Sequence, residues 1–158
     1  MKKFNTVVLP KEYMELGKDA EKRFAERFLK NVRWATLEED RNEHWDVEGD
    51  MGSGRYKFDI KSSANIDDDR FWIEGTNVNG DKGWIKGDAD YIVFERNKSW
   101  FIANRQKLYD WIVKKLEENG NKKGSGFYEI HQREGRYDKI VMARCYDVPK
   151  TVADYFSK

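Results

Sequence analysis

A chain of 158 residues with 39% hydrophobic and 15% aromatic residues is long enough for one domain with a real core, and this composition excludes an intrinsically disordered chain. Charged residues make up 37%, but the formal net charge is only +1, so the overall charge neither demands nor excludes a polyanionic partner. The single cysteine, Cys145, cannot form an internal disulfide, and no apolar run approaches the length of a membrane span. We therefore expect a single domain over residues 1–158, in a reducing cytoplasmic compartment and without membrane contact.

The first half of the chain is expected to contain one long helix and three strands. After a loose lead-in over residues 1–11, apolar residues at helical spacing predict a helix over 12–31. Residues 34–41 are expected to form a connection or a short strand. Alternating apolar residues then predict three strands, near 44–49, 56–61 and 70–76. Glycine-rich turn signals place loops between these strands and after them, at 49–54 and 77–87.

The second half of the chain is expected to add four strands and a second helix. The strands are predicted near 91–95, 99–103, 127–132 and 139–146. Asn104 is a plausible N-cap for a helix over 105–118, and a basic loop over 119–126 follows it. The last two strands would form a C-terminal β-hairpin. This mixture of strands and two main helices predicts an α/β (α+β) fold built on a sheet.

Asp46, Asp59 and Lys61 lie on two segments that are both predicted to be strands. Because side chains alternate along a strand, Asp59 and Lys61 share one face and Ile60 lies on the other. Two carboxylates that hold Mg²⁺, with an ammonium beside the attacking water, are what a metal-dependent phosphodiesterase needs. The alternative is a solvated polar face on an ordinary strand, because short acid-x-Lys triplets also arise by chance in so charged a chain.

Glu21 projects from the middle of the apolar face of the first predicted helix, between Phe28 and Val32. A carboxylate in that position is costly unless it is paired or bound to a metal. Gly17, one turn earlier, leaves room beside it. Glu21 therefore either joins the two aspartates around an ion, or snorkels to solvent or pairs with a core lysine such as Lys61.

The remaining candidates are a further acid and a set of basic residues. Glu74, at the end of the third strand, is either another carboxylate of the metal site or a surface acid. Residues 1–90 carry 16 Lys and Arg against 20 Asp and Glu, whereas residues 91–158 carry 14 against 9. A basic second half fits a phosphate-binding track beside an acidic metal site, although unequal solvated faces would look the same. The track residues would be Lys122, Lys123, Arg133 and Arg136.

Taken in chain order, these residues resemble the PD-(D/E)xK nuclease superfamily. The resemblance depends on Glu21 in the first helix, Asp46 on one strand and Asp59-Ile60-Lys61 on the next, and it covers roughly residues 17–103. The spacing is similar to that of archaeal-type Holliday junction resolvases, and residues 71–94 and the basic hairpin look like small phage-encoded members. The resemblance implies a restriction-endonuclease-like core, with a central mixed β-sheet flanked by helices. One departure is the helix that the superfamily has between its third and fourth core strands, because residues 77–87 are too short and glycine-rich for it.

The resemblance also implies an activity, a magnesium-dependent DNA endonuclease in which Mn²⁺ can substitute. Carried over by position, Asp46 and Asp59 would ligate the metal together with the Ile60 carbonyl. Glu21 would contact the ion directly or through water, and Lys61 would position or activate water and offset charge in the transition state. Branched or junction DNA is a candidate substrate. The alternatives are a catalytically silent nucleic-acid-binding or regulatory module on the same fold and an inhibitor of another nuclease. The sequence leaves open whether the chain forms a homodimer.

Overall fold

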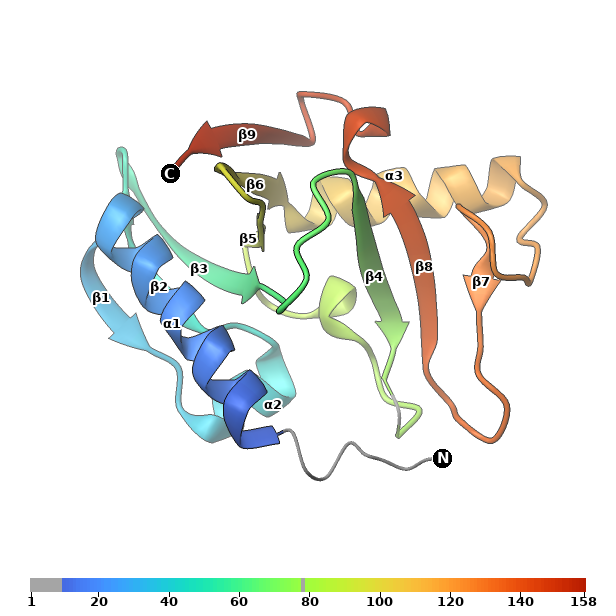
Figure 1. The fold of residues 1–158 in the computed structure, drawn as a ribbon, viewed down its shortest axis with the longest axis horizontal. Coiled ribbons are helices and arrows are strands. Elements are labelled where there is room, and N and C mark those ends of the chain that lie inside the picture. Colours follow the sequence, from blue (N-terminus) through green and yellow to red (C-terminus); the bar gives the residue numbers. More distant parts are fainter. Residues whose placement is uncertain (1–9, 78) are drawn as a thin grey trace.

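The computed structural model describes residues 10–77 and 79–158, which form two β-sheets, three α-helices and two 3₁₀ helices (Figure 1). In chain order the elements are α1 (Pro10–Phe28), β1 (Lys30–Trp34), α2 (Leu37–Glu43), β2 (Val47–Met51), β3 (Gly54–Lys61), β4 (Arg70–Thr76), η1 (Trp84–Lys86), β5 (Tyr91–Glu95), β6 (Ser99–Asn104), α3 (Arg105–Glu118), β7 (Ile130–His131), β8 (Lys139–Arg144), η2 (Cys145–Asp147) and β9 (Ala153–Ser157). None of the described helices is long and apolar enough to cross a membrane. Of the expected lead-in, residues 1–9 lie outside the described residues, and α1 already begins at Pro10.

The larger sheet is mixed and has six strands in the order β1-β2-β3-β5-β6-β9. Its central pair, β3 and β5, is parallel, and its other neighbouring pairs are antiparallel. Helix α1 covers one face of this sheet (Figure 1) because Phe24 on α1 packs against Phe58 and Trp100, with ring centroids 5.3 and 5.5 Å apart. The prediction of a mixed α/β fold with a central mixed sheet flanked by helices is therefore confirmed.

A smaller sheet, in the order β4-β8-β7, covers the opposite face of the larger sheet together with α3 and η1. Phe71 of β4 packs against Phe94 of β5 and Phe101 of β6, and Leu108 and Ile112 bring α3 into the same core. Side chains alternate along β5, so that strand contributes to the cores on both faces of the larger sheet. Phe94 points into this core, and its neighbour Val93 points into the core under α1. The expected C-terminal β-hairpin is present as β7 and β8, although β9 follows it.

The resemblance implies that residues 70–76, just before the missing helix, are a core strand of the central sheet, but β4 lies in the smaller sheet. It pairs instead with β8, with Ile73 opposite Val141, while β3 pairs directly with β5. Alternation predicts that a segment is a strand but not which strand it pairs with. The crossover from β3 to β5 thus runs through β4 and η1, and among the residues that the structure describes there is no helix between β4 and β5 other than the short η1. The segment before η1 packs tightly on β4, because a Cβ atom at Gly83 would lie 2.3 Å from the Glu74 carbonyl oxygen.

The N-terminal boundaries differ from those predicted. The helix ends at Phe28 rather than residue 31, because Asn31 adopts a left-handed conformation (φ 53°), and Val32 lies on β1, not on the helix face. Residues 34–41, expected as a connection or short strand, contain the start of α2. The strand expected at 44–49 begins only at Val47, because His44 caps α2 in the left-handed region.

The C-terminal strands are also shorter than predicted. Strand β7 covers only Ile130 and His131, because Tyr128 has a left-handed backbone (φ 59°) that interrupts the expected strand over 127–132. Strand β8 ends at Arg144, where η2 begins. Strand β9 was not predicted, because three of its five residues are exposed at the edge of the sheet and give no buried alternation. The predicted strand 91–95 and helix 105–118 are confirmed, with Asn104 accepting a hydrogen bond from the Lys107 amide.

Candidate active site

Asp46 is fixed at the end of the β2–β3 pair, immediately before β2. The two strands are antiparallel, so the start of β2 lies beside the end of β3. The Asp46 amide donates to the Phe58 carbonyl at 2.8 Å, and the Asp46 Oδ2 accepts a hydrogen bond from the Ile60 amide at 2.7 Å. The Asp46 carboxylate is therefore held over the backbone of the Asp59-Ile60-Lys61 triplet.

Asp59 and Lys61 share the face of β3 that points away from α1, as the alternation predicted. Ile60 belongs to the core under α1, whereas Lys61 Nζ lies 4.7 Å from the centroid of the Trp84 ring on the opposite side. Lys61 Nζ is 3.1 Å from Asp59 Oδ2, and the two side chains are 33% and 6% exposed. Lys61 thus pairs with a buried carboxylate while part of its own side chain remains accessible to solvent.

Glu21, Asp40 and Asp46 line one pocket of about 250 Å³ between α1, β1 and α2, together with Lys18, Lys22, Trp34 and Ala35. Glu21 comes from α1 and Asp40 from α2. The pocket therefore brings acids from three separate parts of the chain to the end of the β2–β3 pair. We refer to Glu21, Asp40, Asp46 and Asp59 as the acidic cluster.

Three carboxylates of the acidic cluster, those of Asp46, Glu21 and Asp40, have raised pKa values. Burial first, and then the charges of Asp59 and Glu21, raise the pKa of Asp46 to about 9, against the opposing hydrogen bond from the Ile60 amide. The pKa of Glu21 is raised by burial and by the charges of Asp40 and Asp59. The pKa of Asp40 is raised by partial loss of contact with water and by the charge of Asp59. Bound cations reverse this balance, because they favour the ionised form of every carboxylate around them.

The cluster fits a hard divalent cation in the chemistry of its donors. All of its side-chain donors are carboxylate oxygens, which suit Mg²⁺ or Mn²⁺ better than softer metals. Within residues 10–77 and 79–158, however, no three acidic, histidine or cysteine side chains already lie in the arrangement of a metal site. Two of the carboxylates have other partners, since Asp46 accepts from the Ile60 amide and Asp59 pairs with Lys61. Binding an ion would therefore require these side chains to turn within the cluster.

Lys61 is held in its charged form by the acids around it. Burial acts to lower its pKa, but the charges of Asp59, Asp46 and Glu74 prevail and keep the pKa above the ordinary value. Glu74 lies on β4, and its own pKa is raised by burial and partly lowered by Lys61 and by a hydrogen bond from the Trp84 amide. A lysine that stays protonated suits stabilisation of a phosphate better than the role of general base.

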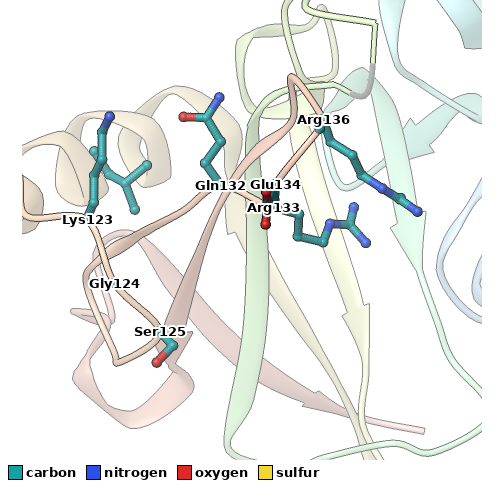
Figure 2. A pocket seen from close by; sticks show the side chains of 9 residues that line it. Lys123, Gly124, Ser125, Gln132, Arg133, Glu134 and Arg136 are labelled. Carbon is teal, nitrogen blue, oxygen red and sulfur yellow. The ribbon is translucent and has the colours of Figure 1, made fainter. Parts of the chain in front are cut away.

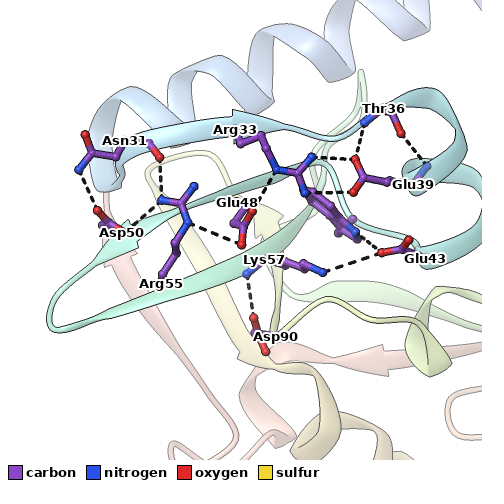
Figure 3. A network of polar contacts seen from close by, with 11 residues as sticks. Asn31, Arg33, Thr36, Glu39, Glu43, Glu48, Asp50, Arg55, Lys57 and Asp90 are labelled. Carbon is purple, nitrogen blue, oxygen red and sulfur yellow. Dashed lines mark hydrogen bonds and ion pairs between the residues drawn. The ribbon is translucent and has the colours of Figure 1, made fainter.

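Asp40 on α2 is the member of the acidic cluster that was not predicted from the sequence. A polar network on the face of the larger sheet away from α1 holds α2 in place (Figure 3). Arg33 of β1 pairs with Glu39 of α2 at 2.9 Å and with Glu48 of β2 at 3.2 Å. The Thr36 hydroxyl accepts from the Glu39 amide, and the Glu39 carboxylate accepts from the Thr36 amide. This Thr-x-x-Glu capping box is visible in the sequence and could have predicted α2, and with it Asp40.

The predicted basic residues gather around a second cavity, of about 600 Å³, at the β7–β8 hairpin (Figure 2). Lys123, Arg133 and Arg136 line this cavity, whereas Lys122 does not and pairs with Glu129 at 3.4 Å. Arg133 forms an ion pair with the buried Asp138.

The hairpin lies within electrostatic reach of the acidic residues around Lys61. The pKa of Glu74 is raised mainly by burial, and the charge of Asp138, the partner of Arg133, also contributes.

Comparison of the chain with protein-family models, with curated proteins and with solved structures found no match.

Proposed function

We propose that this protein is a Mg²⁺-dependent DNA endonuclease of the PD-(D/E)xK type. The observation that carries the proposal is the convergence of Glu21, Asp46 and Asp59 with Lys61 at one end of the β2–β3 pair. Glu21 and Asp46 share a pocket, Asp46 is bonded to the backbone of Ile60, and Asp59 is paired with Lys61. Carboxylates whose pKa is raised by burial and by neighbouring acids are poorly placed for stability alone, which favours a role in holding a cation.

Each residue has a role that follows from its position. Asp46, Asp59 and Glu21 would hold Mg²⁺ together with the Ile60 carbonyl, and the bound ion would supply Lewis-acid catalysis of phosphodiester hydrolysis. The Ile60 amide orients the Asp46 carboxylate toward the triplet. Lys61, kept protonated, would donate to a phosphate oxygen and stabilise the negative charge that grows in the transition state.

Cleavage assays on a panel of DNA structures would test this function. Linear duplex, single-stranded, flap and four-way-junction DNA would be incubated with Mg²⁺, with Mn²⁺ and with EDTA. We expect cleavage with either metal ion and none with EDTA. A folded protein that binds DNA but cleaves none of these substrates would instead be the catalytically silent binding module.

Replacing Lys61 with Met should lower kcat by about 100-fold or more without weakening metal binding. The loss falls on charge stabilisation in the transition state, which is typically worth a factor of about 10²–10³ for one donor. Single-turnover cleavage and calorimetry with Mn²⁺ would measure the two effects separately. Lys57→Met is the matched control, because Lys57 lies on the same strand but pairs with Glu43 outside the cluster. A Lys61→Met protein that cleaves at the wild-type rate would make Lys61 only a surface charge.

Replacing both Lys123 and Arg136 with Ala should weaken DNA binding to all sequences alike. Both residues line the hairpin cavity, and phosphate contacts position a protein without reading sequence. The slope of log K against log salt should decrease by about 0.9 for each lost contact on duplex DNA. Fluorescence anisotropy over a salt series would measure it, with Lys150→Ala as the control because Lys150 is 88% exposed and outside that cavity. An unchanged slope in the double variant would place the DNA elsewhere.

A further inference from the structure

A third cavity, of about 550 Å³, opens beside Lys61 where β3 ends and the chain crosses to β4. Its volume falls within the ~300–1,000 Å³ typical of pockets for small organic groups. Lys61, Asn65, Arg70, Trp72, Trp84 and Arg96 are among the residues that line it. We call it the aromatic pocket. Through Lys61 it adjoins the acidic cluster, so a ligand in this pocket would lie next to the proposed scissile phosphate.

The aromatic pocket offers an exposed ring. Trp72 is 42% exposed, although large aromatic side chains are usually buried, and it is one of the rings that line the pocket. The ring packs against that of His131 of β7, with centroids 5.0 Å apart and the planes nearly perpendicular. This contact restricts the orientation of the Trp72 side chain. An indole that is held in place and partly exposed is a surface on which a flat ring can stack.

The pocket also contains a buried cation with an unused donor. Arg96 is 8% exposed, and its Nη1 donates to the backbone carbonyls of Asp67 and Arg70. Its Nε–H has no acceptor within residues 10–77 and 79–158. This atom is itself buried, so a ligand in the pocket would meet the positive charge of the guanidinium rather than this donor. Arg70, whose side chain is 50% exposed, lies at the rim and pairs there with Asp67 at 3.2 Å.

We propose that the aromatic pocket binds an unpaired nucleobase of the DNA strand that is cut. The base would stack on Trp72, its edge would face the guanidinium of Arg96 and meet the Asn65 amide, and Arg70 would contact the adjoining phosphate. Bases inside a continuous duplex are already stacked and paired, so they cannot enter such a pocket without being extruded. The preferred substrate is therefore DNA with unpaired nucleotides, such as single strands, flaps or open junctions. The inference rests on the proposed function, because it names the substrate class of the same site.

Replacing Trp72 with Ala tests the proposal through binding rather than cleavage. Fluorescence anisotropy in EDTA would follow a labelled oligo(dT) strand and a blunt duplex of equal length, with wild type and variant. Trp72→Ala should weaken binding of oligo(dT) by about tenfold, the size expected for one lost base–aromatic stack, and leave duplex binding unchanged. Trp72→Phe should restore most of the affinity. Tyr146→Ala is the matched control, because Tyr146 is 69% exposed and outside the pocket.

The outcomes separate this inference from the proposed function. If Trp72→Ala binds oligo(dT) as well as wild type does, or loses oligo(dT) and duplex equally, the pocket does not take an unpaired base, even where Mg²⁺-dependent cleavage is intact. If wild type does not bind oligo(dT), the inference is likewise overturned. If instead no DNA is cleaved but oligo(dT) binding still depends on Trp72, the nuclease proposal fails and the base-binding pocket stands.

Discussion

Replacing Asp59 with Asn should abolish Mg²⁺-dependent DNA cleavage, with kcat/KM lowered by about 1,000-fold or more. Asp59 is a buried acid of the cluster, with a side chain 6% exposed, and its charge raises the pKa of Asp46, Glu21 and Asp40. A neutral amide keeps the size of the side chain but binds a divalent cation poorly. Loss of the several kcal/mol that a metal ion contributes to the transition state corresponds to a factor of this size.

The same substitution should remove metal binding, which calorimetry with Mn²⁺ would measure directly. Asp50→Asn is the matched control, since it removes the same charge from β2 at a half-exposed position paired with Arg55. We expect the control to bind Mn²⁺ and to cleave DNA as wild type does. Circular dichroism would verify that both variants are folded. An Asp59→Asn protein that still cleaves DNA in Mg²⁺ would show that the catalytic centre lies elsewhere.

The parts of the site that could be predicted are those encoded by local alternation. A strand with period two puts Asp59 and Lys61 on one face and Ile60 on the other, whatever the strand pairs with, and the structure agrees. Glu21 was predicted from its position on an apolar helix face, and the pocket that it shares with Asp46 fits that reasoning. Both inferences needed only the geometry of a single element.

The parts that could not be predicted depend on long-range pairing. Strand β4 was recognised as a strand, but its partner β8 comes much later in the chain, and no local pattern identifies it. The aromatic pocket forms between the two sheets, so predicting it would also require knowing that β4 belongs to the smaller sheet. Asp40 is a different case, because the capping box that starts α2 was in the sequence and was overlooked.

The acidic cluster should lower the stability of the metal-free protein, and replacing one of its acids with a neutral residue should remove part of this loss. Catalytic sites often hold charged groups in arrangements that weaken the fold in the absence of their ligand. Here the pKa of Asp46 is raised, by burial first and then by Asp59 and Glu21, from an ordinary 3.8 to about 9. Asp59 differs from Asp46 because its carboxylate forms an ion pair with Lys61 at 3.1 Å. Substitution of the two aspartates should therefore change stability by different amounts, although both are needed for activity.

Replacing Asp46 with Asn should abolish cleavage and yet stabilise the metal-free protein, by about 2–4 kcal/mol at pH 7, which is several degrees in Tm. The sign follows from proton uptake. Between pH values of about 4 and 9 the unfolded chain has lost the Asp46 proton while the folded protein retains it, so the free energy of unfolding falls as the pH rises through this range. The amide side chain of the Asp46→Asn variant would not titrate, and its oxygen can still accept from the Ile60 amide, so this pH-dependent loss should disappear.

Thermal unfolding in EDTA at several pH values would measure this effect for wild type, Asp46→Asn and Asp59→Asn. The stability gain of Asp46→Asn should grow from acid pH toward pH 9, whereas Asp59→Asn should gain less, because it leaves Lys61 without its ion-pair partner. Added Mg²⁺ should stabilise wild type but not Asp46→Asn, since a ligand that binds only the folded state raises its stability by mass action. If Asp46→Asn is less stable than wild type at every pH, the Asp46 carboxylate supports the fold, and the repulsion argued for the cluster is absent.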